Sequence, residues 1–424
     1  MPSLDDIAAQ VAGYDPDALP VAQAQAFIAR LVPRVQAVES LALRSALGRV
    51  LARDIVSPID VPSHDNSAMD GYALRAADLA ADGDSLIGVA GTAFAGAQFR
   101  SAVAAGHGVR IMTGAVMPAG LDTVVPQEFT RAAPDGRICI PAGTVAAGDN
   151  RRLAGEDLAR GAVALAAGRT ITPADLGLLA SLGQAEVPVF RRLRVAFFST
   201  GDELRSIGEP LDAGCVYDSN RYTLWGMLQR LGVDPIDMGV VRDDPAALRQ
   251  AFTQAAASAD AVITSGGVSV GEADHTRQVM KELGEVLFWK IAMRPGRPMA
   301  IGRIGTRSAM LFGLPGNPVA VMVTFYALVR DALLAMSGAT PQPLPLLRAV
   351  SAVALRKKPG RTEYQRGIVT PMADGRWQVQ VTGAQGSGIL RSMSQANGMV
   401  LLHHGQGHVA AGDLVDVIPF QGLV

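Results

Sequence analysis

The chain has 424 residues, too many for one ordinary hydrophobic core, so we expect several domains. Its 49% hydrophobic and 18% charged residues exclude an intrinsically disordered chain. The 38 Lys and Arg residues nearly balance the 39 Asp and Glu residues, for a net charge of −1. This balance disfavours a general nucleic-acid or membrane-surface binder, although it leaves room for a local basic pocket.

The two cysteines, Cys139 and Cys215, stand in no metal-binding pattern and are too few for a disulfide framework. The N-terminal sequence is acidic and lacks the basic-then-apolar order of a signal peptide. The longest apolar run, Val319–Val329, ends at charged residues and is too short to span a bilayer. We therefore expect a cytoplasmic protein.

The first part of the chain is predicted to be largely helical. Val21–Leu31 and Leu41–Ile55 both carry apolar residues at helical spacing. A further helix is predicted to begin after Thr172, an N-cap residue that is followed by a proline. Residues 1–57 and 158–192 are therefore grouped as a helical, linking domain.

Residues 58–157 predict a mostly β domain, because short β-type runs alternate with Gly and Pro turns. The first segment, 58–73, is a polar loop that fits a solvated turn, since Asp and Asn favour turns for local reasons. Met69 and Tyr72 indicate partial burial, however, and a half-buried carboxylate at Asp70 would be a functional candidate.

Residues 193–341 alternate strand and helix, which predicts a doubly wound parallel sheet covered by helices. A short apolar strand at 260–264 is followed by a glycine turn and a helix start, where backbone N–H groups could bind an anion. The alternative is that these glycines only shape a tight turn. Residues 342–424 return to short β-type runs and predict a small β-barrel or sandwich.

Acidic residues follow the predicted strands of the α/β domain. In an open α/β sheet the carboxyl ends of the strands line one crevice, so these side chains should converge. Carboxylates that face glycine turns suit a phosphate ligand carrying Mg²⁺. The following segment adds Lys290, Arg294 and Arg297, although a snorkelling lysine and an exposed turn would also explain them. The carboxylates are Asp202, Glu203, Asp243 and Asp274.

An ordered set of motifs resembles the molybdopterin molybdenumtransferase family, which includes MoeA and the E domain of gephyrin. The single pieces are weak, but the set runs in order over nearly the whole chain. The matching segments are 60–72, 110–115, 155–157, 199–204, 242–244, 265–274, 313–318 and 385–387.

The resemblance implies an elongated homodimer that converts adenylylated molybdopterin and molybdate into molybdenum cofactor and AMP with Mg²⁺. It also implies the adenylyltransferase and apo-molybdoenzymes as partners. The residues proposed for catalysis are Asp70, Thr113, Asp157, Glu203, Asp243, Asp274, Lys290 and Arg294, with Glu203, Asp243 and Asp274 as the metal ligands. The residues proposed for substrate binding are Ser199, Thr200, Gly201, Gly266, Gly267, Ser269, Gly271, Arg297, Gly313, Pro315, Gly316, Asn317, Arg366 and Ser387.

One departure and two alternatives accompany the resemblance. The family usually has lysine where this chain has Arg294 and Arg297, so charge is kept but donor geometry differs. The first alternative is a molybdopterin adenylyltransferase, which shares a glycine-turn α/β domain. The second is a non-catalytic, gephyrin-like scaffold. The additional β regions and the Asp70 loop favour the molybdenumtransferase.

Overall fold

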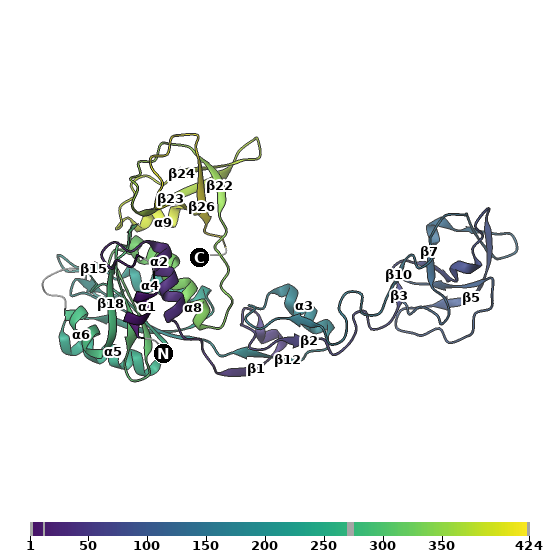
Figure 1. Cartoon of the computed structure of the whole chain (residues 1–424), viewed down its shortest axis with the longest axis horizontal. Coiled ribbons are helices and arrows are strands. Elements are labelled where there is room, and N and C mark those ends of the chain that lie inside the picture. The colour runs from purple at the N-terminus through teal and green to yellow at the C-terminus, as the bar shows by residue number, and fades with distance from the viewer. Residues whose placement is uncertain (1–2, 12, 269–274, 422–424) are drawn as a thin grey trace.

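The computed structural model describes residues 3–11, 13–268 and 275–421. The molecule is elongated (Figure 1). An α/β domain and a C-terminal barrel lie together at one end, a small linking domain follows, and a β domain stands at the opposite end. The expected α/β-plus-β, multidomain class is confirmed.

A mixed sheet forms the centre of the α/β domain, with the strand order β16-β13-β17-β21-β20-β18. The first four strands are parallel, as predicted. β20 runs antiparallel to both of its neighbours, β21 and β18, so the fully parallel sheet expected from the alternation is wrong at this edge. A tight turn at Gly305 joins β20 to β21 without a helical crossover, which parallel pairing would need. The strands are β13 (Arg194–Thr200), β16 (Asp234–Val241), β17 (Ala261–Ser265), β18 (Gly284–Lys290), β20 (Pro298–Ile304) and β21 (Ala309–Leu314), and a small ladder pairs β14 (Leu204–Arg205) with β15 (Val216–Tyr217).

Helices cover the sheet, and their starts carry the capping residues that the sequence supplies. Asp218 caps α4 by accepting the Arg221 N–H, and Asp244 caps α5 by accepting the Ala247 N–H. The helices are α4 (Ser219–Arg230), α5 (Pro245–Ser258), α6 (His275–Leu283), α7 (Pro318–Thr324) and α8 (Arg330–Met336).

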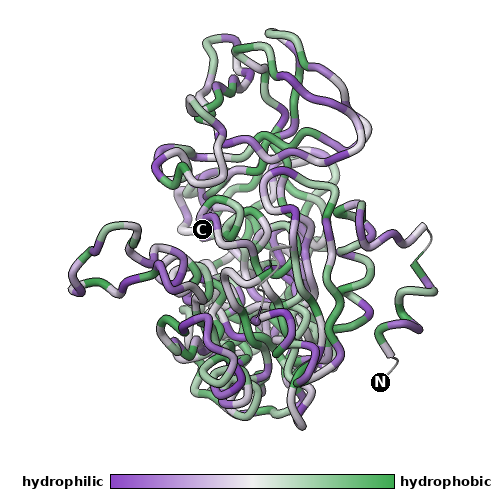
Figure 2. Tube along the Cα trace, turned by 90° about the vertical axis from the view of Figure 1, so that its left-hand side faces the viewer, coloured by the Kyte–Doolittle hydropathy of each residue, from purple (hydrophilic) through white to green (hydrophobic). Residues whose placement is uncertain are grey.

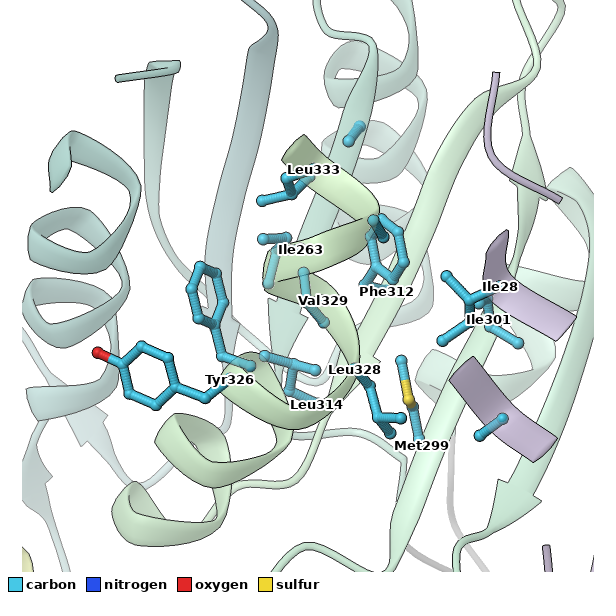
Figure 3. Close-up of a cluster of buried hydrophobic side chains, with 14 of the residues drawn as sticks. Ile28, Ile263, Met299, Ile301, Phe312, Leu314, Tyr326, Leu328, Val329 and Leu333 are labelled. Carbon is cyan, nitrogen blue, oxygen red and sulfur yellow. The ribbon is translucent and has the colours of Figure 1, made fainter. Parts of the chain in front are cut away.

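A π-helical segment, η4 (Phe325–Val329), joins α7 and α8 into one helix. This Pro318–Met336 helix is the one in the described chain that is long and apolar enough to cross a membrane. It continues beyond the charged pair at 330–331, where the longest apolar run of the sequence ends. Because 72% of its most apolar window is buried inside the protein, it is the core helix of the α/β domain. Figure 3 shows Leu328, Val329 and Leu333 packed beside Ile263 and Phe312 of the sheet.

The N-terminal helices α1 (Leu4–Ala9) and α2 (Val21–Leu31) belong to this same core. Ile28 of α2 lies against Ile301 of the sheet (Figure 3), and Phe27 packs edge-on against Trp289. Placing the first helices in the linking domain was therefore wrong, because their buried faces pack on the α/β domain. The hydropathy colouring shows apolar stretches running through this domain beneath the barrel (Figure 2).

The linking domain contains strands and one substantial helix. The helix predicted over Leu41–Ile55 is wrong, because its first residues extend an antiparallel ladder with β12. The predicted start at Thr172 is confirmed, with a complete capping box to Asp175. The elements are β1 (Val38–Ala42), η1 (Leu43–Ala46), β2 (Ile55–Val56), β11 (Val163–Leu165), α3 (Pro173–Ser181) and β12 (Glu186–Phe190).

The β domain is inserted between two paired strands of the linking domain. The Ser57 and Ala162 backbones are joined by a 2.9 Å hydrogen bond, and the Gly161 N–H returns one to Ser57, also at 2.9 Å. The main sheet has the order β7-β4-β6-β5-β9-β8, and β3 pairs with β10. The elements are β3 (Asn66–Ser67), β4 (Gly71–Leu74), η2 (Ala76–Asp78), β5 (Ser85–Ala93), β6 (His107–Ile111), β7 (Thr123–Pro126), η3 (Gln127–Phe129), β8 (Arg131–Ala132), β9 (Ile138–Ile140) and β10 (Arg151–Arg152).

The C-terminal domain is a closed barrel, as predicted. Its strands follow the order β23-β24-β22-β26-β25, and an additional β25–β23 pairing closes the sheet. The strand β19 (Met293–Arg294), which belongs to the preceding domain in sequence, adds to β23 in parallel. The elements are β22 (Leu347–Ser351), β23 (Thr362–Pro371), β24 (Trp377–Val381), α9 (Leu390–Gln395), β25 (Gly398–Leu402) and β26 (Leu414–Pro419).

Candidate active site

A cleft of about 740 Å³ opens at the carboxyl ends of β13, β17 and β21 and is walled on one side by the barrel. Segments that lie far apart in sequence meet there, as expected for an open α/β sheet. Of the residues proposed from the sequence, the cleft is lined by Thr200, Gly201, Glu203, Asp243, Gly266, Gly267, Arg294, Arg297, Pro315, Gly316, Asn317 and Ser387.

The glycine turn after β17 requires its glycines. Gly266 and Gly267 have φ angles of +93° and +65°, which side chains rarely tolerate. A Cβ on Gly266 would also stand 2.7 Å from the Thr200 carbonyl oxygen. The Gly266 N–H donates to the Leu314 carbonyl at 3.1 Å, so this amide is not free to bind an anion as the sequence pattern had suggested.

A buried polar chain lies beneath the turn. The Ser199 hydroxyl lies 3.0 Å from the Asp218 carboxylate and 2.9 Å from the Ser265 hydroxyl. Asp218 also forms an ion pair with Arg221. Because a carboxylate only accepts, Ser199 donates to Asp218 and Ser265 must then donate to Ser199. Ser265, which lines the cleft, is left with an oxygen that can only accept from a ligand.

The acidic wall of the cleft carries Glu203 and Asp243. The Glu203 carboxylate folds over Gly201, where a Cβ would stand 2.5 Å from Oε2. The Asp243 N–H donates to Asp202 at 3.3 Å, which joins two of the strand-end loops. Three further proposed residues, Ser269, Gly271 and Asp274, lie outside the described residues.

Arginines line the other side of the cleft, beyond β17 and β21 in the strand order. Arg294 ends β19, Arg297 stands on the turn between β19 and β20, and Arg361 reaches the cleft from the barrel. Arg361 is held by Glu363, whose Oε1 accepts from Nε at 2.8 Å and which is only 1% exposed. A buried carboxylate therefore fixes this guanidinium in place.

Lys290, Ser199, Gly313 and Arg366 do not line the cleft. The Lys290 ammonium binds Asp17 at 2.6 Å, and both Lys290 and Arg297 lower the pKa of the Asp17 carboxyl. Gly313 lies within β21, where a Cβ would meet Val268 at 2.7 Å, so its role there is packing. Arg366 is buried beneath helix α9 and the loop that follows β24.

Asp70, Thr113 and Asp157 lie in the β domain, far from the cleft of their own chain (Figure 1). The exposed Asp70 carboxylate accepts from the Thr113 N–H at 2.6 Å and from the Thr113 hydroxyl at 2.7 Å. These two bonds hold the pKa of Asp70 below its usual value, with the backbone N–H as the larger cause. Asp157 is exposed in the neck between the β and linking domains, where its N–H donates to Val61.

Sequence reasoning missed Asn220, Ser265, Arg361 and Gln385, all of which line the cleft. The Asn220 amide donates to the Gly316 carbonyl at 2.7 Å and so holds the second glycine turn. Asn220 is a polar residue on the first turn of a helix that follows a strand-end loop, and this position was the available signal. Arg361 and Glu363 are spaced to lie on one face of a strand, and this acid–base pair was the available signal.

Three regions of the chain match described families, and together they cover most of it. Residues 19–183 match the MoeA N-terminal region (domain I and II), 196–335 match a "Probable molybdopterin binding domain", and 348–420 match the MoeA C-terminal region (domain IV).

Curated relatives agree over the full length. The molybdopterin molybdenumtransferase of Haemophilus influenzae is 42% identical over 95% of this chain and 98% of its own. That of a Nostoc species is 36% identical over 92% and 91%. The crystal structure of the molybdopterin biosynthesis protein MoeA from Pyrococcus horikoshii OT3 superposes with a TM-score of 0.81 at 28% identity, over 95% of this chain and 99% of that one. The chain therefore belongs to the molybdopterin molybdenumtransferase family.

Proposed function

We propose that this enzyme acts in molybdenum cofactor biosynthesis, where it inserts molybdenum from molybdate into the dithiolene of adenylylated molybdopterin and releases AMP with the help of Mg²⁺. The observation that carries the proposal is the polarity of the cleft. Glu203 and Asp243 stand on one wall, and Arg294, Arg297 and Arg361 stand on the other. Family membership supplies the reaction class. The cleft supplies charges that suit the phosphoryl oxygens of adenylylated molybdopterin and the incoming molybdate.

The arginine wall accounts for binding of an anionic substrate. Guanidinium groups bind phosphoryl and molybdate oxygens with two parallel N–H donors, and a partly enclosed cleft strengthens that attraction. When a water or molybdate oxygen attacks the AMP phosphorus, the phosphoanhydride bond breaks and negative charge develops on the bridging oxygen, which departs with the molybdopterin phosphate. Arg294 and Arg297 lie where such charge would be offset.

The carboxylate wall fits Mg²⁺. This ion is commonly held by one or two carboxylates together with substrate phosphates and water, so Glu203 and Asp243 suffice as protein ligands, with Asp274 as the proposed third. Within residues 3–11, 13–268 and 275–421, no group of three His, Cys, Asp or Glu side chains is placed to hold a metal. When bound, the ion would neutralise phosphoryl charge and make the phosphoanhydride easier to cleave.

A second subunit would complete the site. Asp70 and Thr113 stand at the opposite end of the chain from the cleft, yet the family resemblance marks both as functional. The resemblance implies a two-fold homodimer in which the β domain of one protomer faces the cleft of its partner, and the two-fold axis would then give two equivalent mixed sites. We assign Asp70 to the partner's cleft on this basis.

Reconstitution tests the proposal. The purified protein is mixed with adenylylated molybdopterin, molybdate and Mg²⁺, and both AMP and the activation of an apo-molybdoenzyme are measured. We expect both to depend on molybdate. ATP consumption without molybdate would favour the adenylyltransferase alternative, and the absence of any turnover would favour a scaffold. The same assay shows whether an adenylyltransferase supplies the substrate and an apo-molybdoenzyme receives the product.

A further inference from the structure

Arg366 is a charged side chain with no exposed surface, buried between β23, helix α9 and the loop that follows β24. Its guanidinium binds neutral acceptors, and in the described part of the chain no carboxylate forms an ion pair with it. Nε donates to the Ser392 hydroxyl at 2.9 Å, Nη1 to the Gln385 carbonyl at 3.2 Å, and Nη2 to the Gly386 carbonyl at 2.9 Å. A buried charge is costly unless its donors are satisfied, so these bonds restrain the loop as firmly as they restrain the arginine.

The attachment is reciprocal. The Gln385 side chain accepts from the Arg366 N–H at 2.8 Å and donates to the Arg366 carbonyl at 3.2 Å. It also donates to the Thr382 carbonyl at 2.9 Å. Each of the two residues therefore uses its side chain to hold the backbone of the other.

The far end of the same loop is tied to the α/β domain. The Ser387 carbonyl accepts from the Val319 N–H at 3.0 Å, which satisfies a donor in the first turn of α7. Gln385, Gly386 and Ser387 line the cleft, whereas Arg366 does not. The loop is thus held by a buried arginine on one side and by the first turn of α7 on the other. Residues 385–387 of the loop line the cleft.

We propose that Arg366 is a positioning residue for the molybdenum transfer reaction. It fixes residues 384–387 so that Ser387 and the loop backbone stay in the cleft wall, and it does not bind the substrate itself. The expected effect on kcat/KM rests on the proposed function. The expected restraint of residues 384–387 by Arg366 does not require substrate.

A double-mutant cycle separates positioning from direct binding. Arg366→Lys keeps the charge but cannot reach three acceptors in the plane of a guanidinium, so we expect kcat/KM to fall on the order of ten- to a hundredfold. Combined with Ser387→Ala, the loss should be clearly smaller than the product of the single losses, because both changes act through one loop. Arg361→Lys is the matched control. It changes an arginine that lines the cleft by itself, so its effect should multiply with that of Ser387→Ala.

Hydrogen exchange provides a readout that does not depend on turnover. Without substrate, amides of residues 384–389 and of Val319 should exchange at least about tenfold faster in Arg366→Lys than in the unchanged protein. Ser392→Ala removes the Nε acceptor and keeps the arginine, so it should shift the same amides in the same direction.

Unchanged exchange in both variants, together with a multiplicative cycle, would show that Arg366 meets the substrate directly. If Arg366→Lys fails to fold, as judged by circular dichroism, Ser392→Ala carries the exchange test alone, and unchanged exchange there would overturn the proposal. Should the unchanged protein release no AMP, the proposed function fails while the exchange result still decides the role of Arg366.

Discussion

Carboxylates that look alike in the sequence have distinct roles at the residue scale. Asp65 forms an ion pair with Arg151 and accepts the Ala154 N–H at 2.8 Å, so it holds the β domain together. Asp218 is buried and caps a helix. Glu203 faces the cleft. The role of each carboxylate therefore depends on which hydrogen-bond donors it already binds.

Glu203→Gln should weaken Mg²⁺ binding by at least about tenfold, because the amide keeps the shape but loses the negative charge that attracts the ion. Binding can be measured by titration with Mn²⁺ followed by electron paramagnetic resonance, alongside AMP release. Glu209→Gln, on the loop between β14 and β15 outside the cleft lining, is the control. Equal Mn²⁺ affinity in both variants would remove Glu203 from the metal site.

Thr113→Val should raise the pKa of Asp70 part of the way toward the usual aspartate value of about 3.9. The hydroxyl bond is lost but the backbone N–H, the larger cause of the lowering, remains. Because the pKa is depressed in the folded protein, any stability from this contact is present above the usual value and is lost as pH falls through the folded one. Carbon-13 NMR titration of the carboxyl measures the shift. An unchanged pKa would mean that the hydroxyl contributes nothing.

At the scale of elements, local sequence rules explain most boundaries in the α/β domain. Capping aspartates stand at the starts of α4 and α5, and both α5 and the linking-domain helix α3 begin with a proline after the capping residue. The helix expected over Leu41–Ile55 did not form, because pairing with β12 outweighed its helical spacing. Strand partners that lie far away in sequence leave no local signal.

Thr172→Ala should lower the free energy of unfolding by about 1 kcal/mol, since it removes one side of the capping box of α3. The Thr172 hydroxyl also donates to Asp175 at 2.8 Å, so the buried carboxylate loses one donor while it keeps Arg169 and the Thr172 N–H. Urea unfolding followed by circular dichroism measures the change. Ser181→Ala at the other end of α3 is the control and should be nearly neutral. A loss that is equal in both variants would argue against the cap.

The candidate site was only partly predictable from the sequence. Strand-end residues such as Glu203 and Arg294 could be placed because parallel strands share an edge. Arg361 and Gln385 could not be placed, because they enter from a barrel whose docking no local pattern reveals. Arg366 was assigned to substrate binding from the family resemblance, and its burial depends on helix α9 and a distant loop that cover it.

At the scale of the whole molecule, the separation of the β domain from the cleft is the dominant feature (Figure 1). The linking domain holds the two apart, so under the proposed function Asp70 could reach the cleft of its own chain only by a large domain movement. A shared site in a dimer is the simpler arrangement.

Subunit exchange tests the shared site. Homodimers of Asp70→Ala and of Glu203→Ala should each be inactive. After mixing in equal amounts, each heterodimer holds one intact site and one doubly altered site, so roughly a quarter of the original sites should return. Native mass spectrometry confirms that heterodimers have formed. Activity that stays at background in their presence would place Asp70 outside the partner's cleft.

The hydrogen bonds between Ser57 and residues 161 and 162 have a consequence for the history of the gene. A segment whose two ends are neighbours can be gained or lost in one recombination event without disturbing the core of its host. The linking domain has the same property, since the Arg191 N–H binds the Ala37 carbonyl at 3.0 Å where the chain leaves and re-enters the α/β domain. The β domain is therefore inserted in the linking domain, and the linking domain is inserted in the α/β domain. A coding sequence organised in this way can gain a remote residue such as Asp70 by insertion without any change to the cleft.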